Sequence, residues 1–367
     1  MLLSVIIPLY NNVPYLRECI DSLYRQGISE SDFEVVIIDD GSTDGGGDLA
    51  DQVATEHPNI QVYHQSNQGT GNARNAGLQK AQGDYIHYVD PDDFLFDHSY
   101  QHIVQELLQG SPDILCFGYA NDGTAGTECQ KGDILYQGLA RDYYATRGMR
   151  VNLPFKWVKR SFIAEHHLTF PPLCYGEDTV FTWDALRYAN TLVVSNGVVY
   201  SYRTKSGSAV NGRTIEHIIS TISDLIYVNL QLRSFAKDYI GCRAVRSNFT
   251  HKYRVLFDRI LCTPFTYDEI TQIFAQCAPI GTRHLAQNVR MWWINYLYHH
   301  PKLYFTAQRL IIVIYFGLNP NFAQNADFLT DRITDGKWVR KADKEMSHVA
   351  SFFIRVWNYI DCHIGNH

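Results

Sequence analysis

The first 90 residues alternate four short apolar runs with longer, more polar segments, and this alternation constrains the fold more than any other feature. It predicts strands at 3–8, 33–39, 60–64 and 85–89, separated by helices at about 14–27, 47–57 and 70–82. In the first of these helices the apolar residues recur at three- and four-residue spacing, as in a helix that lies on a sheet. The sequence therefore predicts βαβ units and an open α/β sheet.

Polar or small residues follow each of the four predicted strands. Open α/β sheets bind ligands at the carboxyl ends of their strands, so we expect these loops to converge on one edge. A dinucleotide site of the Rossmann type is not expected, because the first strand leads into Leu9, Tyr10 and Asn11 and not into Gly-x-Gly-x-x-Gly. The first loop offers an aromatic ring instead.

Three carboxylates, those of Asp90, Asp92 and Asp93, follow the fourth predicted strand at once. They repel one another unless a cation lies among them or their pKa values rise. Asp-x-Asp at a strand end is typical of a hard-cation site in which one or two carboxylates, phosphate oxygens and water hold the ion. The alternative is a solvated Asp-Pro-Asp-Asp turn that caps a helix beginning near Asp97.

Two further strand ends carry candidate binding groups. Asp39 and Asp40 could accept hydrogen bonds from a nucleobase N–H or from ribose hydroxyls. The same stretch could instead form an Asx-turn, with Ser42 or Asp44 starting the next helix. After the third strand, a glycine-bearing loop precedes a helix whose N-terminal amides and Arg74 could face a diphosphate.

These residues lie in four blocks whose order and spacing resemble the family 2 glycosyltransferases of GT-A fold. The blocks span 5–11, 36–44, 67–77 and 83–93. The resemblance implies that Tyr10 stacks on the base of a nucleotide-sugar and that Asp39 and Asp40 reach the base and ribose. It implies that Asp92 holds a divalent metal, Mn²⁺ or Mg²⁺, on the diphosphate, with Asp90 and Asp93 supporting the ribose and the metal shell. The other implied donor-binding residues are Pro8, Asn67, Gly69, Arg74, Lys156, Arg203 and Ser208.

Later segments continue the resemblance. The segment 156–163 is similar to a family motif but departs from it at Phe155, Trp157 and Val158, which leaves the role of Lys156 open. The segment 175–181 fits the family's acidic motif at a helix start and implies that Asp178, with Glu177 beside it, is the catalytic base; alternatively both only complement the helix dipole. The segment 200–208 is similar to the loop that closes over the donor diphosphate.

The last 150 or so residues differ in character from the front. Residues 1–215 hold 15 Lys and Arg against 26 Asp and Glu, whereas residues 216–367 hold 17 against 12. We expect a GT-A catalytic domain at 1–214 and a helical domain at 215–367 for acceptor, membrane-surface or oligomer contacts. The predicted helices are 215–235, 242–262, 267–277, 281–300, 304–316 and 343–360.

An apolar run at 310–318 is flanked by Lys302 and Arg309. It predicts either a helix in the interface of an anionic membrane or a segment packed against the catalytic domain. The run is about half the length that a bilayer span needs. With no positive segment before the first apolar run, which stops at Pro8, no signal peptide is expected, and the predicted location is the cytoplasm, at the inner face of the membrane.

Together these features and the resemblance predict an inverting glycosyltransferase that moves a sugar from a nucleoside diphosphate sugar to a hydroxyl of an acceptor. The expected donor is a UDP-sugar, and the expected acceptor is a glycan or lipid-linked glycan in surface polysaccharide biosynthesis. One alternative is a nucleotidyltransferase or pyrophosphorylase, which would normally carry a basic, glycine-rich loop after the first strand. Another is a non-catalytic nucleotide-sugar-binding protein. Nucleic acid is not an expected partner, because the front half is acidic and lacks clustered Lys and Arg.

Overall fold

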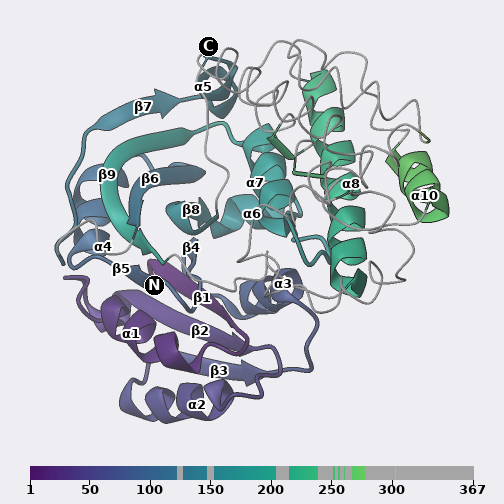
Figure 1. Cartoon of the computed structure of the whole chain (residues 1–367). Coiled ribbons are helices and arrows are strands. Elements are labelled where there is room, and N and C mark those ends of the chain that lie inside the picture. Colours follow the sequence, from purple (N-terminus) through teal and green to yellow (C-terminus); the bar gives the residue numbers. More distant parts are fainter. Residues whose placement is uncertain are drawn as a thin grey trace, which may run out of the picture. The chain divides into compact units, whose positions relative to one another are not determined.

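A computed structural model describes residues 1–121, 127–146, 153–203, 215–238 and 267–277, with isolated positions at 251–252, 255–256, 260 and 302 (Figure 1). The chain divides into two compact units. The first comprises Met1–Ser208 and Gln231–Phe249, and the second comprises Ala209–Leu230 and Thr250–His367. Helix α8 (Ile215–Asp238) therefore contributes residues to both units.

The first unit is built on one mixed sheet, which has nine strands within the described residues (Figure 1). The strand order is β3-β2-β1-β4-β8-β6-β9-β5, with β7 paired to β9. The first four strands run parallel, while β8 is antiparallel to both of its neighbours. The strands are β1 Leu3–Leu9, β2 Phe33–Asp39, β3 Ile60–His64, β4 Tyr85–Tyr88, β5 Phe94–Leu95, β6 Ile114–Asn121, β7 Ile134–Gly138, β8 Lys156–Lys159 and β9 Leu192–Tyr202.

Helices cover both faces of the parallel part of the sheet, which is why its inner strands β1, β2 and β4 are buried along their whole length. Alternate side chains of β1 and β2 pack in one core with α1 and α2. Helix α3 lies on the opposite face, where Gly77 sits so close to Ile6 that a side chain there would clash. The helices of this unit before α8 are α1 Val13–Leu23, α2 Gly46–Glu56, α3 Thr70–Lys80, α4 Ser99–His102, α5 Ala140–Thr146, α6 Arg160–Glu165 and α7 Glu177–Tyr188.

The four predicted strands agree with β1 to β4 within one residue at each end, but α1 ends earlier than the predicted 27. The side chain of Gln26 explains the early end of α1. Its Nε2 donates to the carbonyl of Ser22, 2.7 Å away, and so caps the helix, while Gly27 turns the chain with φ +67°. A helix capped near Asp97 by the Asp-Pro-Asp-Asp turn is not seen, since β5 intervenes and α4 begins at Ser99.

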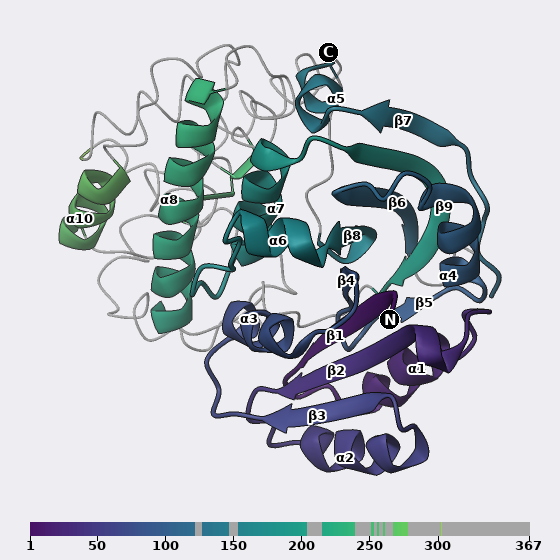
Figure 2. The ribbon, with the colours of Figure 1, turned by 180° about the vertical axis from the view of Figure 1, so that it is seen from behind.

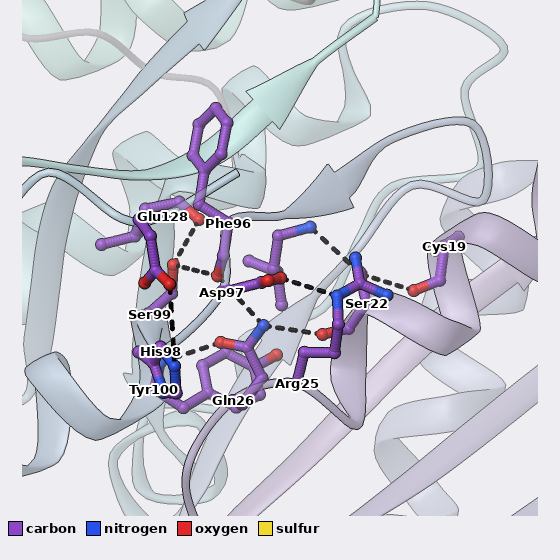
Figure 3. Close-up of polar contacts among 12 residues, drawn as sticks. Cys19, Ser22, Arg25, Gln26, Phe96, Asp97, His98, Ser99, Tyr100 and Glu128 are labelled. Atoms are coloured by element: carbon purple, nitrogen blue, oxygen red, sulfur yellow. Dashed lines mark hydrogen bonds and ion pairs between the residues drawn. The ribbon is translucent and has the colours of Figure 1, made fainter. Parts of the chain in front are cut away.

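A polar network fixes the segment after the acidic loop to the end of α1 (Figure 3). The buried Gln26 also donates to the carbonyl of Phe96 at 3.1 Å and accepts from the backbone N–H of Tyr100 at 3.0 Å. Nearby, Arg25 and Asp97 form an ion pair at 2.7 Å. Because these contacts start only a few residues beyond Asp93, they anchor the C-terminal side of the acidic loop.

The N-terminal side of that loop is anchored by His87 on β4. This imidazole is fully buried, accepts from the hydroxyl of Tyr100 at Nδ1 (2.9 Å) and donates from Nε2 to the carbonyl of Pro154 (2.8 Å). A carbonyl can only accept, so the proton of the neutral ring must be on Nε2. Burial lowers the pKa of His87 to about 4.

In the second unit, the described helix α10 spans Tyr267–Cys277, the range predicted from the sequence. None of the helices in the described part of the chain is long and apolar enough to cross a membrane. The apolar run at 310–318 and the predicted helices at 281–300, 304–316 and 343–360 lie outside the described residues, as does nearly all of the one predicted at 242–262.

Candidate functional site

The carboxyl ends of β1, β2, β3 and β4 lie at one edge of the sheet, as expected from their parallel pairing. Tyr10 follows β1 and is 46% exposed, so its ring is available to a ligand. Pro8 is buried within β1, two residues before it. Asn11 Oδ1 accepts from the backbone N–H of Thr43 at 2.8 Å and so ties the first loop to the second.

Asp39 ends β2, and its carboxylate is held from both sides. Oδ1 accepts from the backbone N–H of Ser42 at 3.0 Å, and Oδ2 lies 2.9 Å from Nδ1 of His64. Burial alone would raise the pKa of Asp39, but these hydrogen bonds outweigh it and hold the pKa below its ordinary value. Asp39 is therefore an ionised acceptor with a fixed orientation.

Asp40 has a different task from its neighbour. Its carboxylate accepts from the backbone N–H groups of Gln68 and Gly69, both at 2.8 Å, and from the side chain of Gln65 at 2.7 Å. The side chain is buried, so these contacts shape the loop that contains the exposed Asn67. Gly69 has φ +88°, a conformation that favours glycine, and precedes the first residue of α3.

The acidic loop after β4 turns its three carboxylates in different directions. Asp93 points inward and is 2% exposed; Oδ2 accepts from the hydroxyl of Tyr200 at 2.8 Å and Oδ1 from the backbone N–H of Arg203 at 2.8 Å. Burial and the charge of Asp90 raise the pKa of Asp93 to about 8. Asp90 and Asp92 remain partly exposed.

Arg203, the residue that follows β9, holds this loop in place. Its Nε donates to the carbonyl of Asp92 at 2.8 Å, its Nη2 contacts Glu18 on α1 at 2.6 Å, and its guanidinium lies over the rings of Tyr15 and Phe94. Arg203 therefore lies next to the acidic loop, and the donor contact expected for it from the sequence stays a prediction. Ser208, predicted in the same segment, lies outside the described residues.

Arg74 links the acidic loop to the start of α7. Nη2 lies 2.9 Å from Asp90 Oδ1, Nη1 lies 2.7 Å from Glu177 Oε1, and the side chain is only 5% exposed. A buried guanidinium that is already paired with two carboxylates is poorly placed to meet a diphosphate. The geometry favours a positioning role for Arg74 over the phosphate contact predicted from the sequence.

Helix α3 (Figure 2) is also joined to the segment before α7, through the side chain of Asn75. Asn75 Nδ2 donates to the carbonyl of Phe170, and Asn75 Oδ1 accepts from the N–H of the same residue, both at 2.9 Å. A side chain at Gly71 would meet the carbonyl of Pro171 at 2.8 Å. Gly71 and the side-chain amide of Asn75 therefore serve the close packing of α3 against the segment that leads into α7.

The two acidic residues at the start of α7 differ in their partners. Glu177 is committed to Arg74. Asp178 is half-buried and accepts from the N–H of Thr179 at 2.6 Å through Oδ1, and Oδ2 accepts no hydrogen bond within the described part of the chain. Lys156 is buried on β8, and burial lowers its pKa while the charge of Asp178 opposes this shift.

Within the described residues, no three His, Cys, Asp or Glu side chains converge closely enough to form a metal cage. Asp90 and Asp92 nevertheless fit a cation such as Mn²⁺ or Mg²⁺, which commonly takes one or two carboxylates and completes its shell with phosphate and water. Burial raises the pKa of Asp90, the positive charge of Arg74 lowers it, and the negative charge of Asp92 raises it again. A cation would relieve the repulsion between the two carboxylates.

The structure reveals three site residues that the sequence did not single out as members of the site, namely His64, Asn75 and Tyr200. Each forms a hydrogen bond with a residue far away in the sequence: His64 with Asp39, Asn75 with Phe170, and Tyr200 with Asp93. Tyr200 falls within the segment 200–208 that the sequence marked, but no alternation of buried and exposed residues identifies it, because Val199 and Ser201 on either side of it are buried as well. The other two depend on strand register and helix packing.

The chain matches the family described as Glycosyl transferase family 2 over residues 4–166. An uncharacterized glycosyltransferase of Haemophilus influenzae is 30% identical over 207 residues, which cover 56% of this chain and 78% of that relative. EpsJ of Bacillus subtilis, an uncharacterized glycosyltransferase, is 30% identical over 218 residues, or 56% of this chain. The match spans 62% of the length of EpsJ.

Two solved structures resemble the fold. TarS 1–349 of S. aureus, in complex with UDP-GlcNAc, has a TM-score of 0.59 at 19% identity, covering 86% of this chain and 91% of that one. The mannosyltransferase PcManGT of Pyrobaculum calidifontis, in complex with GDP-Man and Mn²⁺, has a TM-score of 0.50 at 17% identity, covering 84% of each chain. The likeness confirms the predicted fold, a mixed sheet of GT-A type flanked by helices.

Proposed function

Because the chain belongs to glycosyl transferase family 2, we propose that it moves a sugar, with inversion, from a nucleoside diphosphate sugar to a hydroxyl of an acceptor glycan. One observation carries the proposal. Arg74 holds Asp90 of the acidic loop and Glu177, the neighbour of Asp178, within one buried ion-pair network. The acidic loop, which would stabilise the leaving diphosphate, and the start of α7, where Asp178 can accept a proton, are thus held in a fixed position relative to each other.

The donor nucleotide lies across the ends of β1 to β3. Tyr10, exposed at the end of β1, stacks on the base, and Asp39 accepts the hydrogen bond of a base N–H. Asp40 acts at one remove, by shaping the loop of Asn67 and Gly69 that faces the donor. We favour a UDP-sugar as the donor; a carboxylate acceptor matches the N3–H of uracil, but also the N3–H of thymine and the N1–H of guanine, so the thermal-shift screen below decides among the three nucleotides.

Asp92, with Asp90, would hold a divalent cation. When bound, that cation supplies positive charge opposite the leaving diphosphate. Asp93 supports the loop from inside, because both of its oxygens are taken by Tyr200 and Arg203. Arg203 holds the same loop and adds a cationic guanidinium next to it.

Asp178 is the general base. It takes the proton of the acceptor hydroxyl as the hydroxyl oxygen attacks the anomeric carbon and the bond to the diphosphate breaks. Asp178 is better suited than Glu177, because Glu177 already pairs with Arg74. The buried Lys156 contributes positive charge near Asp178 and not a direct contact with the donor.

We place the acceptor chemistry in surface polysaccharide biosynthesis, with a glycan or lipid-linked glycan as acceptor at the cytoplasmic face of the membrane. Residues 1–214 would form the catalytic domain and residues 215–367 would bind the acceptor or the membrane surface. The excess of Lys and Arg in residues 216–367 supports contact with an anionic acceptor or lipid.

A thermal-shift screen of UDP-, GDP- and dTDP-sugars, each with and without Mn²⁺, tests the proposal. A ligand at about 100 times its dissociation constant adds roughly 2.7 kcal/mol to the free energy of unfolding. One nucleotide-sugar should stabilise the protein, and more strongly with Mn²⁺. No stabilisation by any of the three at millimolar concentration would contradict it.

A further inference from the structure

His64 joins two carboxylates at the edge of the site. It is the last residue of β3 and pairs in register with Asp39, the last residue of β2. Its Nδ1 lies 2.9 Å from Asp39 Oδ2, and its Nε2 lies 3.1 Å from Asp51 Oδ1 on α2. Hydrogen bonds to Asp39 and then Asp51 raise the pKa of His64.

The two contacts differ in how firmly they hold. Asp39 is 8% exposed and Asp51 is 57% exposed, so the contact with Asp39 is the one protected from water. An ionised carboxylate only accepts, so Nδ1 must carry the hydrogen that Asp39 receives.

The space around this hydrogen bond is restricted. Helix α2 begins against it, and a side chain at Gly47 would come within 2.7 Å of Asp39 Oδ2 and 3.4 Å of His64 Cε1. With Ser42 on Oδ1 and His64 on Oδ2, the carboxylate plane of Asp39 cannot turn without losing a hydrogen bond. Removing the donor on Oδ2 would free the group to rotate about χ2.

We propose that His64 is a positioning residue for nucleobase recognition: it orients Asp39 toward the base N–H and so sets the affinity for the nucleotide without touching the diphosphate. The proposal rests on the proposed function, since it takes Asp39 as the acceptor for the base. It predicts that the loss of His64 weakens binding of the nucleoside part only.

Two substitutions separate the hydrogen bond from the ring. In His64→Asn the side-chain amide nitrogen takes the place of Nδ1 and can still donate to Asp39. In His64→Phe a ring of similar size remains at this 49% exposed position, but the donor is lost. Asp51→Ala is the matched control, because it removes the second partner of His64 and leaves the hydrogen bond to Asp39 in place.

Calorimetry with the full chain and Mn²⁺ would measure dissociation constants for UDP, GDP and dTDP, and for inorganic pyrophosphate, which has no base. For the nucleotide that the wild type binds best, His64→Phe should weaken affinity by roughly fivefold, what one hydrogen bond is worth. In His64→Asn and Asp51→Ala the dissociation constant for that nucleotide should stay within about twofold of the wild-type value. Pyrophosphate affinity should be unchanged in every variant.

Wild-type affinity for the nucleotide in His64→Phe would overturn the inference. An equal loss for pyrophosphate, or an equal loss in His64→Asn, would overturn it as well, because either would mean a general disturbance of the site. If the wild type binds none of the nucleotides, the proposed function itself fails, and this result is distinguishable from the others.

Discussion

Lowering the pH from about 7.5 to about 5 should destabilise the protein through His87, the buried imidazole that anchors β4 ahead of the acidic loop. Burial lowers the pKa of His87 to about 4 from an ordinary 6.5. As the pH falls, the unfolded chain takes up the proton before the folded protein does. The stability associated with neutral His87 is therefore complete above about pH 6.5 and is lost as the pH falls toward 4.

The size of the effect follows from the two pKa values. The difference between 6.5 and 4 corresponds to about 3 kcal/mol in total, of which about 2 kcal/mol is lost between pH 7.5 and pH 5. His87→Gln removes the titrating group and can still donate to the carbonyl of Pro154. The variant leaves the hydroxyl of Tyr100 without its acceptor, so it should be less stable at neutral pH by about 1–3 kcal/mol.

Urea unfolding of both proteins at the two pH values measures the difference. The loss of unfolding free energy on acidification should be about 2 kcal/mol smaller in His87→Gln than in the wild type. The control is His98→Asn, which removes a 53% exposed imidazole at a position with φ +61° that Asn tolerates; it should behave like wild type. Equal acid sensitivity in wild type and His87→Gln would refute the reasoning, as would an NMR titration of His87 near 6.5.

Three further substitutions test the site. Asp92→Ala, or chelation of the wild type, should abolish transfer and leave the circular dichroism spectrum unchanged, because a partly exposed carboxylate leaves no core cavity; full activity in EDTA would rule out the metal. Asp178→Asn should keep donor affinity within a few-fold and lower kcat by roughly 10²–10⁴; greater damage from Glu177→Gln would move the base to Glu177. Arg74→Met should lower the free energy of unfolding in urea by about 3–5 kcal/mol, because it leaves Glu177, which is 12% exposed, and the more exposed Asp90 without their shared guanidinium; a loss below about 1 kcal/mol would contradict this bridging role.

The parallel half of the sheet could be predicted from sequence because its signals are local. Each apolar run of β1 to β4 is bounded by polar residues, and parallel pairing then requires the strand ends to share one edge. Parallel pairing therefore predicts that Tyr10, Asp39 and the acidic loop share that edge, as they do in the structure. The other half, β5 to β9, has no comparable local signal, because its pairing, mostly antiparallel but parallel between β6 and β9, joins segments far apart in the chain.

The roles of single residues were harder to predict where they depend on contacts between distant segments. Arg74 follows a glycine-bearing loop, which suggested a phosphate contact, yet its partner Glu177 lies 103 residues further along. Asp40 was expected to reach the ribose, but its hydrogen bonds fold the loop at 65–69. No local pattern marks either role, because the first depends on where α3 lies relative to the start of α7 and the second on how the loop between β3 and α3 folds next to β2.

The most direct test of the central claim, sugar transfer from a nucleotide-sugar, is the release of nucleoside diphosphate from UDP-, GDP- and dTDP-sugars in the presence of Mn²⁺. Wild type, Asp92→Ala and Asp178→Asn would be compared at equal concentration, with water as the acceptor. We predict that the wild type turns over one of these donors slowly, that Asp92→Ala releases none, and that Asp178→Asn binds the donor but releases its diphosphate far more slowly. Failure of the wild type to release diphosphate from any of the three donors, or equal release by Asp92→Ala, would contradict the account.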